Sequence, residues 1–199
     1  NFNVAPTQEI LTIIKHDNVN KLEKLHWGLV PFWAKDISIG SRMINARAET
    51  ASSKPSFRNA FKKRRCLIPA DGFYEWKGEK GNKQPYYVFT PSGEPFAFAG
   101  FWESWTDKES DEESVYKSCT IITTAASESI REIHHRMPVI LDPDFYEKWL
   151  NAEIQDPKEL EIILRDGVIH EMKYYPVSTF VNSVKNNDPN CIKPIDKNL

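Results

Sequence analysis

The chain has 199 residues, with 26 lysines and arginines against 28 acidic residues, so its formal net charge is −2. Hydrophobic residues make up 40% of it and charged residues 27%, a globular balance that excludes a disordered or fibrous chain. We expect one domain over 1–199, large enough to fold without disulfide or metal. Three widely spaced cysteines, an odd number, are typical of reduced thiols.

Membrane and export signals are missing from the sequence. No stretch reaches the roughly 18 apolar residues of a membrane span, and no charged start precedes an apolar run. We therefore expect a cytoplasmic protein without membrane contact, and a monomer is the simplest expectation.

Aromatic and β-branched runs bounded by Pro, Gly and Asp predict the strands. The expected strands are 25–33, 66–76, 85–90, 95–105 and 114–126, with 77–84 as a hairpin loop. Helical spacing predicts helices over 57–64, 144–150 and 157–164. A further short helix is expected to begin at Ser127 and to be closed by residues 133–138. The expected fold is α+β, a curved, mainly antiparallel and barrel-like sheet with flanking helices.

Charge is concentrated in two segments. Residues 107–113 are mostly acidic, which is typical of a solvated hairpin tip. Residues 54–65 contain six basic residues and no acid. Such a block is either a solvated helix face or part of a nucleic-acid surface.

Asn45, Arg47 and Glu49 occupy alternate positions. In an extended strand they share one face, which then either lines a polar pocket or forms a solvent-facing edge. Glu75 lies among the aromatic residues of 73–76. Packing against Trp76 removes water from the carboxyl and raises its pKa toward the range of a general acid or base, unless Glu75 points into solvent.

Residues 133–138 combine His134, His135 and Arg136. Histidine beside arginine suits proton transfer or an anionic substrate, although adjacent histidines rarely face the same site. Helical metal ligands usually stand at i and i+4, so we expect neither a metal nor another cofactor. The tryptophans of 26–33 are either core residues or stacking surfaces for bases.

Taken together, these segments resemble the SRAP family, the SOS response-associated peptidases, which sense abasic sites in single-stranded DNA. The matching stretches follow in order at 3–7, 27–33, 44–50, 69–76, 123–126, 134–138 and 176–182. The resemblance implies that the α-amine and thiol of an N-terminal cysteine capture the aldehyde of an abasic sugar as a thiazolidine. An α-amine is partly unprotonated at neutral pH and can attack a carbonyl.

The resemblance also implies roles for individual residues. Glu75 matches the family's acid and base, His134 the histidine that holds or protonates the opened sugar, and Asn45 the residue that orients the nucleophile. Arg47 and Arg136 match arginines that bind phosphates, because planar forks suit bidentate contacts. Lys54 is a weaker match to a further arginine. Other implied DNA contacts come from Trp33, Pro6 and Thr124.

One departure concerns the nucleophile. The family begins with Cys-Gly-Arg, whereas this sequence begins at Asn1. No internal cysteine has a free α-amine, so the chain as given is expected to bind DNA without forming a thiazolidine. With an N-terminal cysteine it is expected to crosslink. The alternatives are a noncovalent single-stranded DNA binding module, or a peptidase limited to removing its own N-terminal residue. Association with the nucleoid is expected when DNA is bound.

Overall fold

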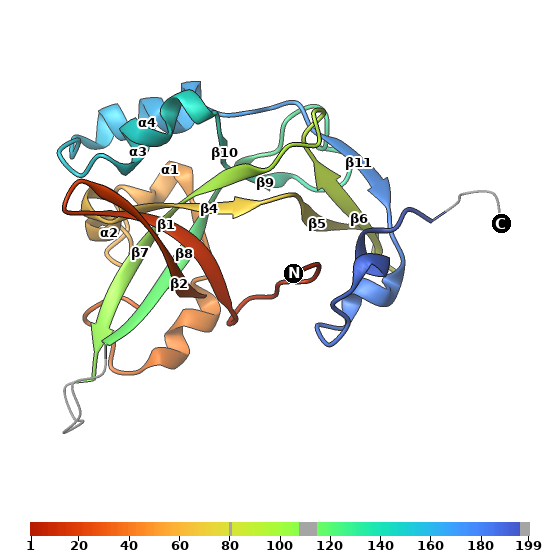
Figure 1. The fold of residues 1–199 in the computed structure, drawn as a ribbon, viewed down its shortest axis with the longest axis horizontal. Coiled ribbons are helices and arrows are strands. Elements are labelled where there is room, and N and C mark those ends of the chain that lie inside the picture. The colour runs from red at the N-terminus through yellow and green to blue at the C-terminus, as the bar shows by residue number, and fades with distance from the viewer. Residues whose placement is uncertain (80, 108–114, 196–199) are drawn as a thin grey trace.

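The computed structural model describes residues 1–79, 81–107 and 115–195. Five strands form a closed ring, at the left of Figure 1. In ring order they are β1 (Glu9–His16), β2 (Val19–Trp27), β8 (Val115–Ala125), β7 (Phe96–Thr106) and β4 (Arg65–Ala70). The β2–β8 pairing is parallel and the other four are antiparallel. The predicted α+β fold with a barrel-like core is therefore confirmed.

The β1–β2 hairpin is the longest element that the sequence patterns missed. Its turn residues Asp17 and Asn18 have φ of 51° and 59°. Asp and Asn tolerate this left-handed conformation, which suits the twist of a two-residue hairpin. Ile10, Thr12 and Ile14 are buried at alternate positions. The sequence signal for this hairpin was therefore the alternation of buried and exposed residues up to His16, followed by the turn residues Asp17 and Asn18.

Two expected strands have different limits. The strand expected over 25–33 ends at Trp27, because Gly28 has φ of 141°. A Cβ at Gly28 would stand 2.7 Å from the carbonyl oxygen of Gly40, so only glycine fits there. The strand expected over 66–76 is two strands, β4 and β5 (Phe73–Lys77), which separate at the Asp71-Gly72 bend.

A second sheet of three strands adjoins the barrel, at the right of Figure 1. Its order is β11 (Lys173–Pro176), β6 (Gln84–Phe89) and β5, all antiparallel. Three short strands extend the barrel sheet: β3 (Asn45–Arg47), β9 (Arg136–Pro138) and β10 (Ile140–Leu141). Because β5 and β6 are consecutive and pair antiparallel, the hairpin connection expected between them is confirmed.

Helices form at the three places where spacing predicted them. They are α2 (Arg58–Lys63), α3 (Tyr146–Leu150) and α4 (Pro157–Asp166). The side chain of Asp156 caps α4 by accepting from Lys158 N, and Pro157 opens its first turn. The remaining helices are α1 (Ala48–Ala51) and the 3₁₀ helices Ile37–Arg42, Pro143–Phe145, Thr179–Asn182 and Pro189–Ile192.

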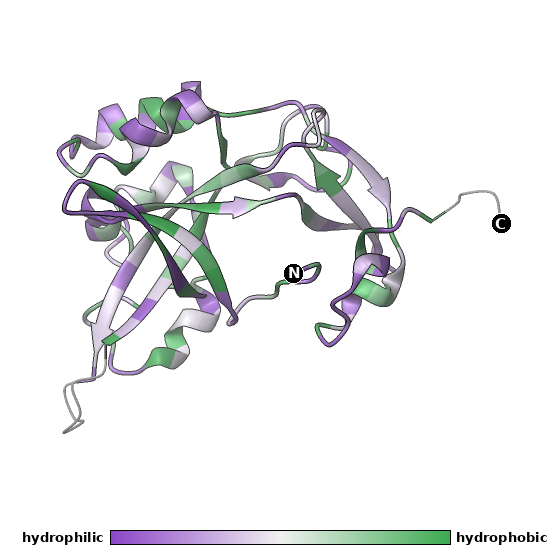
Figure 2. Ribbon diagram, viewed as in Figure 1, coloured by the Kyte–Doolittle hydropathy of each residue, from purple (hydrophilic) through white to green (hydrophobic). Residues whose placement is uncertain are grey.

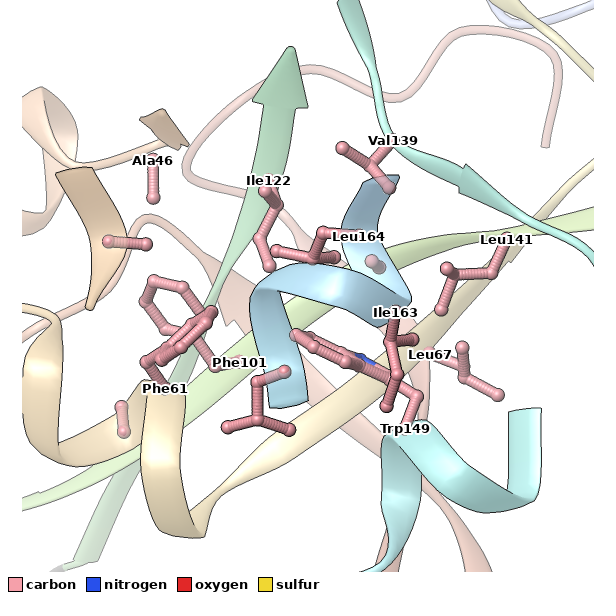
Figure 3. Packing of buried hydrophobic residues seen from close by; sticks show 14 of the residues in the cluster. Ala46, Phe61, Leu67, Phe101, Ile122, Val139, Leu141, Trp149, Ile163 and Leu164 are labelled. Carbon is pink, nitrogen blue, oxygen red and sulfur yellow. The ribbon is translucent and has the colours of Figure 1, made fainter. Parts of the chain in front are cut away.

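The α-helices α1–α4 pack against the barrel strands in one cluster of buried residues. In α4, Leu160, Ile163 and Leu164 are buried, and the hydropathy colouring of Figure 2 shows polar and apolar residues mixed along this helix. Around Trp149, the aromatic side chains Phe61 and Phe101 fill the space between helices and sheet (Figure 3). Burying each large side chain contributes roughly 1.5–3 kcal/mol, so this cluster anchors the helices to the barrel.

The cysteines are core residues, as the strand patterns predicted for Cys66 and Cys119. Cys66, Cys119 and Cys191 are all fully buried. Burial raises the pKa of the Cys66 thiol well above its ordinary value and that of Cys119 to about 12. Such thiols remain protonated and act as small apolar side chains.

The short helix expected to begin at Ser127 does not form, so this prediction is wrong. Residues 128–133 form successive turns instead. The hydroxyls of Ser127 and Ser129 are 2.8 Å apart, and Ser129 Oγ donates to the carbonyl of His170 and accepts from Met172 N. Serine side chains that bind backbone groups in this way compete with helix formation.

Two further sequence expectations bear on the surface. Among the described residues, no helix is both long and apolar enough to cross a membrane. The acidic run 107–113 lies outside the described residues except for Asp107.

Candidate functional site

Glu75 and His134 face each other across the junction between the three-stranded sheet and the turns after β8. Glu75 Oε1 lies 3.7 Å from His134 Nδ1. The side chains remain 22% and 37% exposed, so solvent and small molecules reach both. The separation exceeds a hydrogen bond but permits an ion pair when the imidazole is protonated. The structure thus brings two predicted site residues from distant segments together.

Burial raises the pKa of the Glu75 carboxyl above its ordinary value of 4.5. The opposing influences are the charge of His134, the backbone N–H of Trp76 and the charge of Lys83. Tyr86 of β6 is directly paired with Glu75 in the sheet. The rise in pKa expected from loss of water around Glu75 is therefore present, and its direction is the one that a general acid or base requires.

The Nδ1 atom of His134 lies between two backbone groups of Arg136. It is 3.2 Å from the Arg136 N–H and 3.0 Å from the Arg136 carbonyl oxygen. An unprotonated Nδ1 accepts from the N–H, and a protonated one donates to the carbonyl. Either state of the ring therefore has a partner. The neighbouring His135 is exposed, and its ring centroid lies 4.5 Å from that of His134.

Arg136 makes a fork contact with Glu49. Its Nη1 and Nη2 donate to the two carboxylate oxygens at 2.6 and 3.0 Å, and Nη2 also donates to the Thr123 carbonyl at 2.6 Å. Arg136 lowers the pKa of Glu49, chiefly through this hydrogen bonding. The fork expected to bind a phosphate is thus engaged by a carboxylate, so a phosphate must share or replace it.

The alternation predicted that Glu49 continues the strand of Asn45 and Arg47, and the structure shows that it does not. β3 ends at Arg47, and Glu49 lies in α1. The expectation of a common strand face is wrong for Glu49, because the chain turns into a helix directly after Arg47. The ion pair with Arg136 was missed for the same reason, since nothing local links residues 49 and 136.

Asn45 and Arg47 are exposed, on either side of the buried Ala46. β3 pairs in parallel with β8, which places Arg47 opposite Thr123. On its other edge β8 pairs with β9, which places Ala125 opposite Arg136. The end of β8 therefore brings both arginines to one part of the sheet, around Thr123.

Thr124 is half-buried next to these residues. It lines an open depression of about 300 Å³. The other lining residues are Ala48, Glu49, Glu161, Leu164 and Arg165.

Three residues predicted to contact DNA are not linked to the pair of Glu75 and His134. Trp33 is 47% exposed in the loop after β2, Pro6 is exposed in the N-terminal segment, and Lys54 is exposed between α1 and α2. For the part of the chain that the structure describes, no hydrogen bond, ion pair or ring contact joins them to Glu75 or His134.

The basic block 54–65 is divided between surface and core. Arg65 is only 4% exposed and donates to main-chain carbonyls, including that of Trp149. Arg64 donates to Glu103 at 2.6 Å. The block is therefore not one cationic surface, and its exposed charges are mainly Lys54, Arg58 and Lys63.

The N-terminal segment passes between the barrel and the three-stranded sheet (Figure 1). The hydroxyl of Tyr74 donates to the Phe2 carbonyl at 2.6 Å, and Phe2 N donates to Asn187 Oδ1 at 2.7 Å. The buried Asn3 amide donates to the carbonyls of residues 181, 183 and 186. Tyr74, the neighbour of Glu75 on β5, was not predicted to contact this segment.

Metal binding finds no support in the described ranges. Within them, no group of three or more His, Cys, Asp or Glu side chains is arranged to hold a metal ion. The ionisable groups of the candidate site are the carboxyl of Glu75, the imidazole of His134 and the guanidinium groups of Arg47 and Arg136.

These features define a class: an α+β barrel protein whose surface places a carboxyl beside an imidazole and brings two arginines to one end of a strand. The family described as SOS response associated peptidase (SRAP) matches residues 1–184, and the chain belongs to this family. The resemblance seen in the sequence is thereby confirmed.

Individual relatives agree with this assignment. The chain is 49% identical to the abasic site processing protein YoqW of Bacillus subtilis, over 96% of this chain and 85% of that protein. It is 31% identical to YedK of Escherichia coli, over 98% and 84%. A crystal structure of a protein from Bacteroides thetaiotaomicron superposes with a TM-score of 0.81 at 32% identity, covering 95% of this chain and 82% of that one.

Proposed function

We propose that this protein recognises abasic sites in single-stranded DNA and, when it carries an N-terminal cysteine, captures them covalently as a thiazolidine. The observation that carries the proposal is the pairing of Glu75 with His134 at 3.7 Å, together with the raised pKa of Glu75. Relatives named abasic site processing proteins support the DNA-repair role.

The chemistry requires proton transfers at a carbonyl. The α-amine adds to the aldehyde carbon of the opened sugar, and the resulting hydroxyl leaves as water after protonation, giving an imine. The thiol then adds to the imine carbon, and its proton passes to the nitrogen, which closes the thiazolidine. A protonated Glu75 supplies the proton for the leaving water and takes one back, which suits a carboxyl of raised pKa.

The remaining site residues have supporting roles in this proposal. His134 holds or protonates the oxygen released when the sugar ring opens, and Asn45 orients the attacking amine. Arg47 and Arg136 bind phosphates beside the lesion, with Lys54 as a further cation. The exposed Trp33, with Pro6 and Thr124, lines the path of the strand.

An adduct assay tests the covalent step. The protein carrying an N-terminal cysteine is mixed with a single-stranded oligonucleotide containing one abasic site, and adducts are resolved on a denaturing gel. We expect a stable adduct, which E75Q and H134A form about 10²-fold or more slowly. H135A is the matched control and should react at nearly the normal rate. A thiazolidine adduct from the chain that begins at Asn1, or normal rates in E75Q, would refute the mechanism.

A noncovalent binding module is the second candidate, and the exposure of Arg47 and Lys54 favours it. About three phosphate contacts predict that log affinity falls with log salt at a slope near −2. Binding to an intact strand and an abasic strand with equal affinity, without adduct formation, would favour this candidate. A slope near zero would count against both.

A further inference from the structure

The direct interaction between Glu75 and His134 is too weak to fix the position of the two side chains. Their closest atoms are 3.7 Å apart, beyond a hydrogen bond. His134 also follows a series of turns and precedes β9, so regular strand pairing does not fix its position. The ring of His134 is held to its own segment, because Nδ1 lies within hydrogen-bond distance of the Arg136 N–H and carbonyl oxygen. The contacts that place this segment against the three-stranded sheet therefore also place the imidazole against the carboxyl.

Apolar anchors fix the start of the turn segment. Ile130 and Ile133 are 1% and 7% exposed. Ser129 adds hydrogen bonds to the chain at His170 and Met172. These contacts fix the segment to the rest of the chain, but none of them involves the side chain of Glu75 or His134.

Glu132 connects the same segment to the three-stranded sheet. Its Oε2 lies 3.4 Å from Lys77 Nζ on β5, and its Oε1 accepts a hydrogen bond from the Tyr174 hydroxyl on β11. Glu132 precedes His134 by two residues, and Lys77 follows Glu75 by two residues. Residues 132–134 therefore run antiparallel to residues 75–77, with 132 matched to 77 and 134 matched to 75.

The charges of the two matched pairs are complementary. Lys77 opposes Glu132, and Glu75 opposes a protonated His134. Residues i and i+2 of a strand share a face, so Glu75 and Lys77 are presented to the turn segment together. A shift of the segment by one residue would break both pairs at once.

Tyr174 extends this contact across the sheet. Its ring meets Tyr86 edge-on with centroids 5.7 Å apart, and Tyr86 is the β6 partner of Glu75. The hydrogen bond to Glu132 is the main reason why the pKa of Tyr174 is raised. Glu132 thus binds both outer strands of the sheet whose edge strand carries Glu75.

We infer that Glu132 is a positioning residue, which holds His134 against Glu75 by binding Lys77 and Tyr174. The consequence for catalysis rests on the proposed function, since it concerns the rate of abasic-site capture. Neither a substrate contact nor a proton transfer is assigned to Glu132 itself.

A titration tests the link without DNA. The ionisation of Tyr174 is followed by NMR of tyrosine labelled at Cζ, with Y174F identifying its resonance. In E132Q we expect the pKa of Tyr174 to fall toward its ordinary value, because the carboxylate that opposes phenolate formation is gone. E128Q is the matched control: Glu128 lies in the same turns, with its side chain 90% exposed and 3.4 Å from Arg131. An unchanged Tyr174 titration in E132Q would refute the link.

Capture kinetics test its consequence. With the protein carrying an N-terminal cysteine, E132Q should slow adduct formation at saturating abasic DNA about 3- to 30-fold, while the half-saturating DNA concentration stays within twofold. In an H134A background E132Q should have no further effect, because a residue that acts through His134 has nothing left to position. Equal slowing in both backgrounds, or a normal rate in E132Q, would overturn the inference.

Two controls separate the possible failures. E128Q should react at the normal rate, and E132Q should keep the thermal midpoint of the parent, which excludes misfolding as the cause of slow capture. If the parent itself forms no adduct, the proposed function fails and the catalytic consequence with it. The tyrosine titration still decides whether Glu132 binds Tyr174.

Discussion

Two regions of the molecule place ionisable side chains in opposite surroundings, one buried and one partly exposed. In the buried region, the guanidinium of Arg65 donates to the carbonyls of residues 61, 62, 149 and 151. In the partly exposed region, Glu75 and His134 lie 3.7 Å apart. The hydrogen bonds of the buried guanidinium compensate the loss of water and tie α2 to the end of α3, whereas a carboxyl and an imidazole that remain partly exposed are accessible for proton exchange.

Removing Arg65 should have the largest effect on stability. R65A leaves several buried main-chain carbonyls without a donor, so the free energy of unfolding should fall by about 3 kcal/mol or more, as measured by urea denaturation. R58A, which removes an exposed arginine from α2, should change it by less than about 0.5 kcal/mol. Equal losses of unfolding free energy in R65A and R58A would show that the burial of Arg65 does not contribute to stability.

Removing the fork contact between Glu49 and Arg136 should have an intermediate effect, on the affinity for single-stranded DNA. An ordinary glutamate carboxyl is already ionised at neutral pH and Arg136 lowers the pKa of Glu49 further, so Glu49 competes with a phosphate for the fork. Since the Glu49 side chain is 51% exposed, the contact is worth up to about 1 kcal/mol. E49Q should therefore bind single-stranded DNA up to about fivefold more tightly in a fluorescence anisotropy titration.

E161Q controls for net charge in that experiment. Glu161 lines the same depression but binds Ser52 rather than Arg136. If E161Q strengthens binding as much as E49Q does, the gain reflects overall charge and the fork contact is irrelevant. Weaker binding by E49Q would mean that Glu49 orients Arg136 for the phosphate instead of competing with it.

The smallest expected effect is the pH dependence of stability at Glu75. Burial raises the pKa of this carboxyl, so its ionisation opposes folding at neutral pH. Below its ordinary value of 4.5, the carboxyl is protonated in both folded and unfolded chains, and the cost disappears. E75Q should therefore be slightly more stable than the parent at pH 7, within about 1 kcal/mol, and no more stable at pH 4.

Thermal denaturation at the two pH values measures this difference. E128Q, which removes the same charge from an exposed side chain, corrects for the change in net charge. A stabilisation by E75Q that is equal at both pH values would show that the buried carboxyl is not its source.

Local patterns predicted elements whose start and stop signals lie within the element. α4 is an example, since Asp156-Pro157 opens it and its apolar residues recur at helical spacing. Prediction failed where distant groups intervene: the serines after β8 bind the chain near residue 170, so the expected helix becomes turns. The strand expected through Glu49 failed because the chain turns into α1 directly after Arg47, and local alternation also could not show that the Glu49 carboxylate pairs with a residue 87 positions away.

The sequence by itself determined the barrel-like α+β fold, the family and the residue types available for chemistry, because periodicity, turn residues and motif order are local properties. Only the tertiary structure decided which of them meet. Glu75 and His134 come together because the three-stranded sheet folds back against the turns after β8, while Arg65 joins the core and Arg136 meets Glu49. Hydrogen bonds, burial and the resulting pKa shifts depend on neighbours across space, and a linear pattern does not contain them.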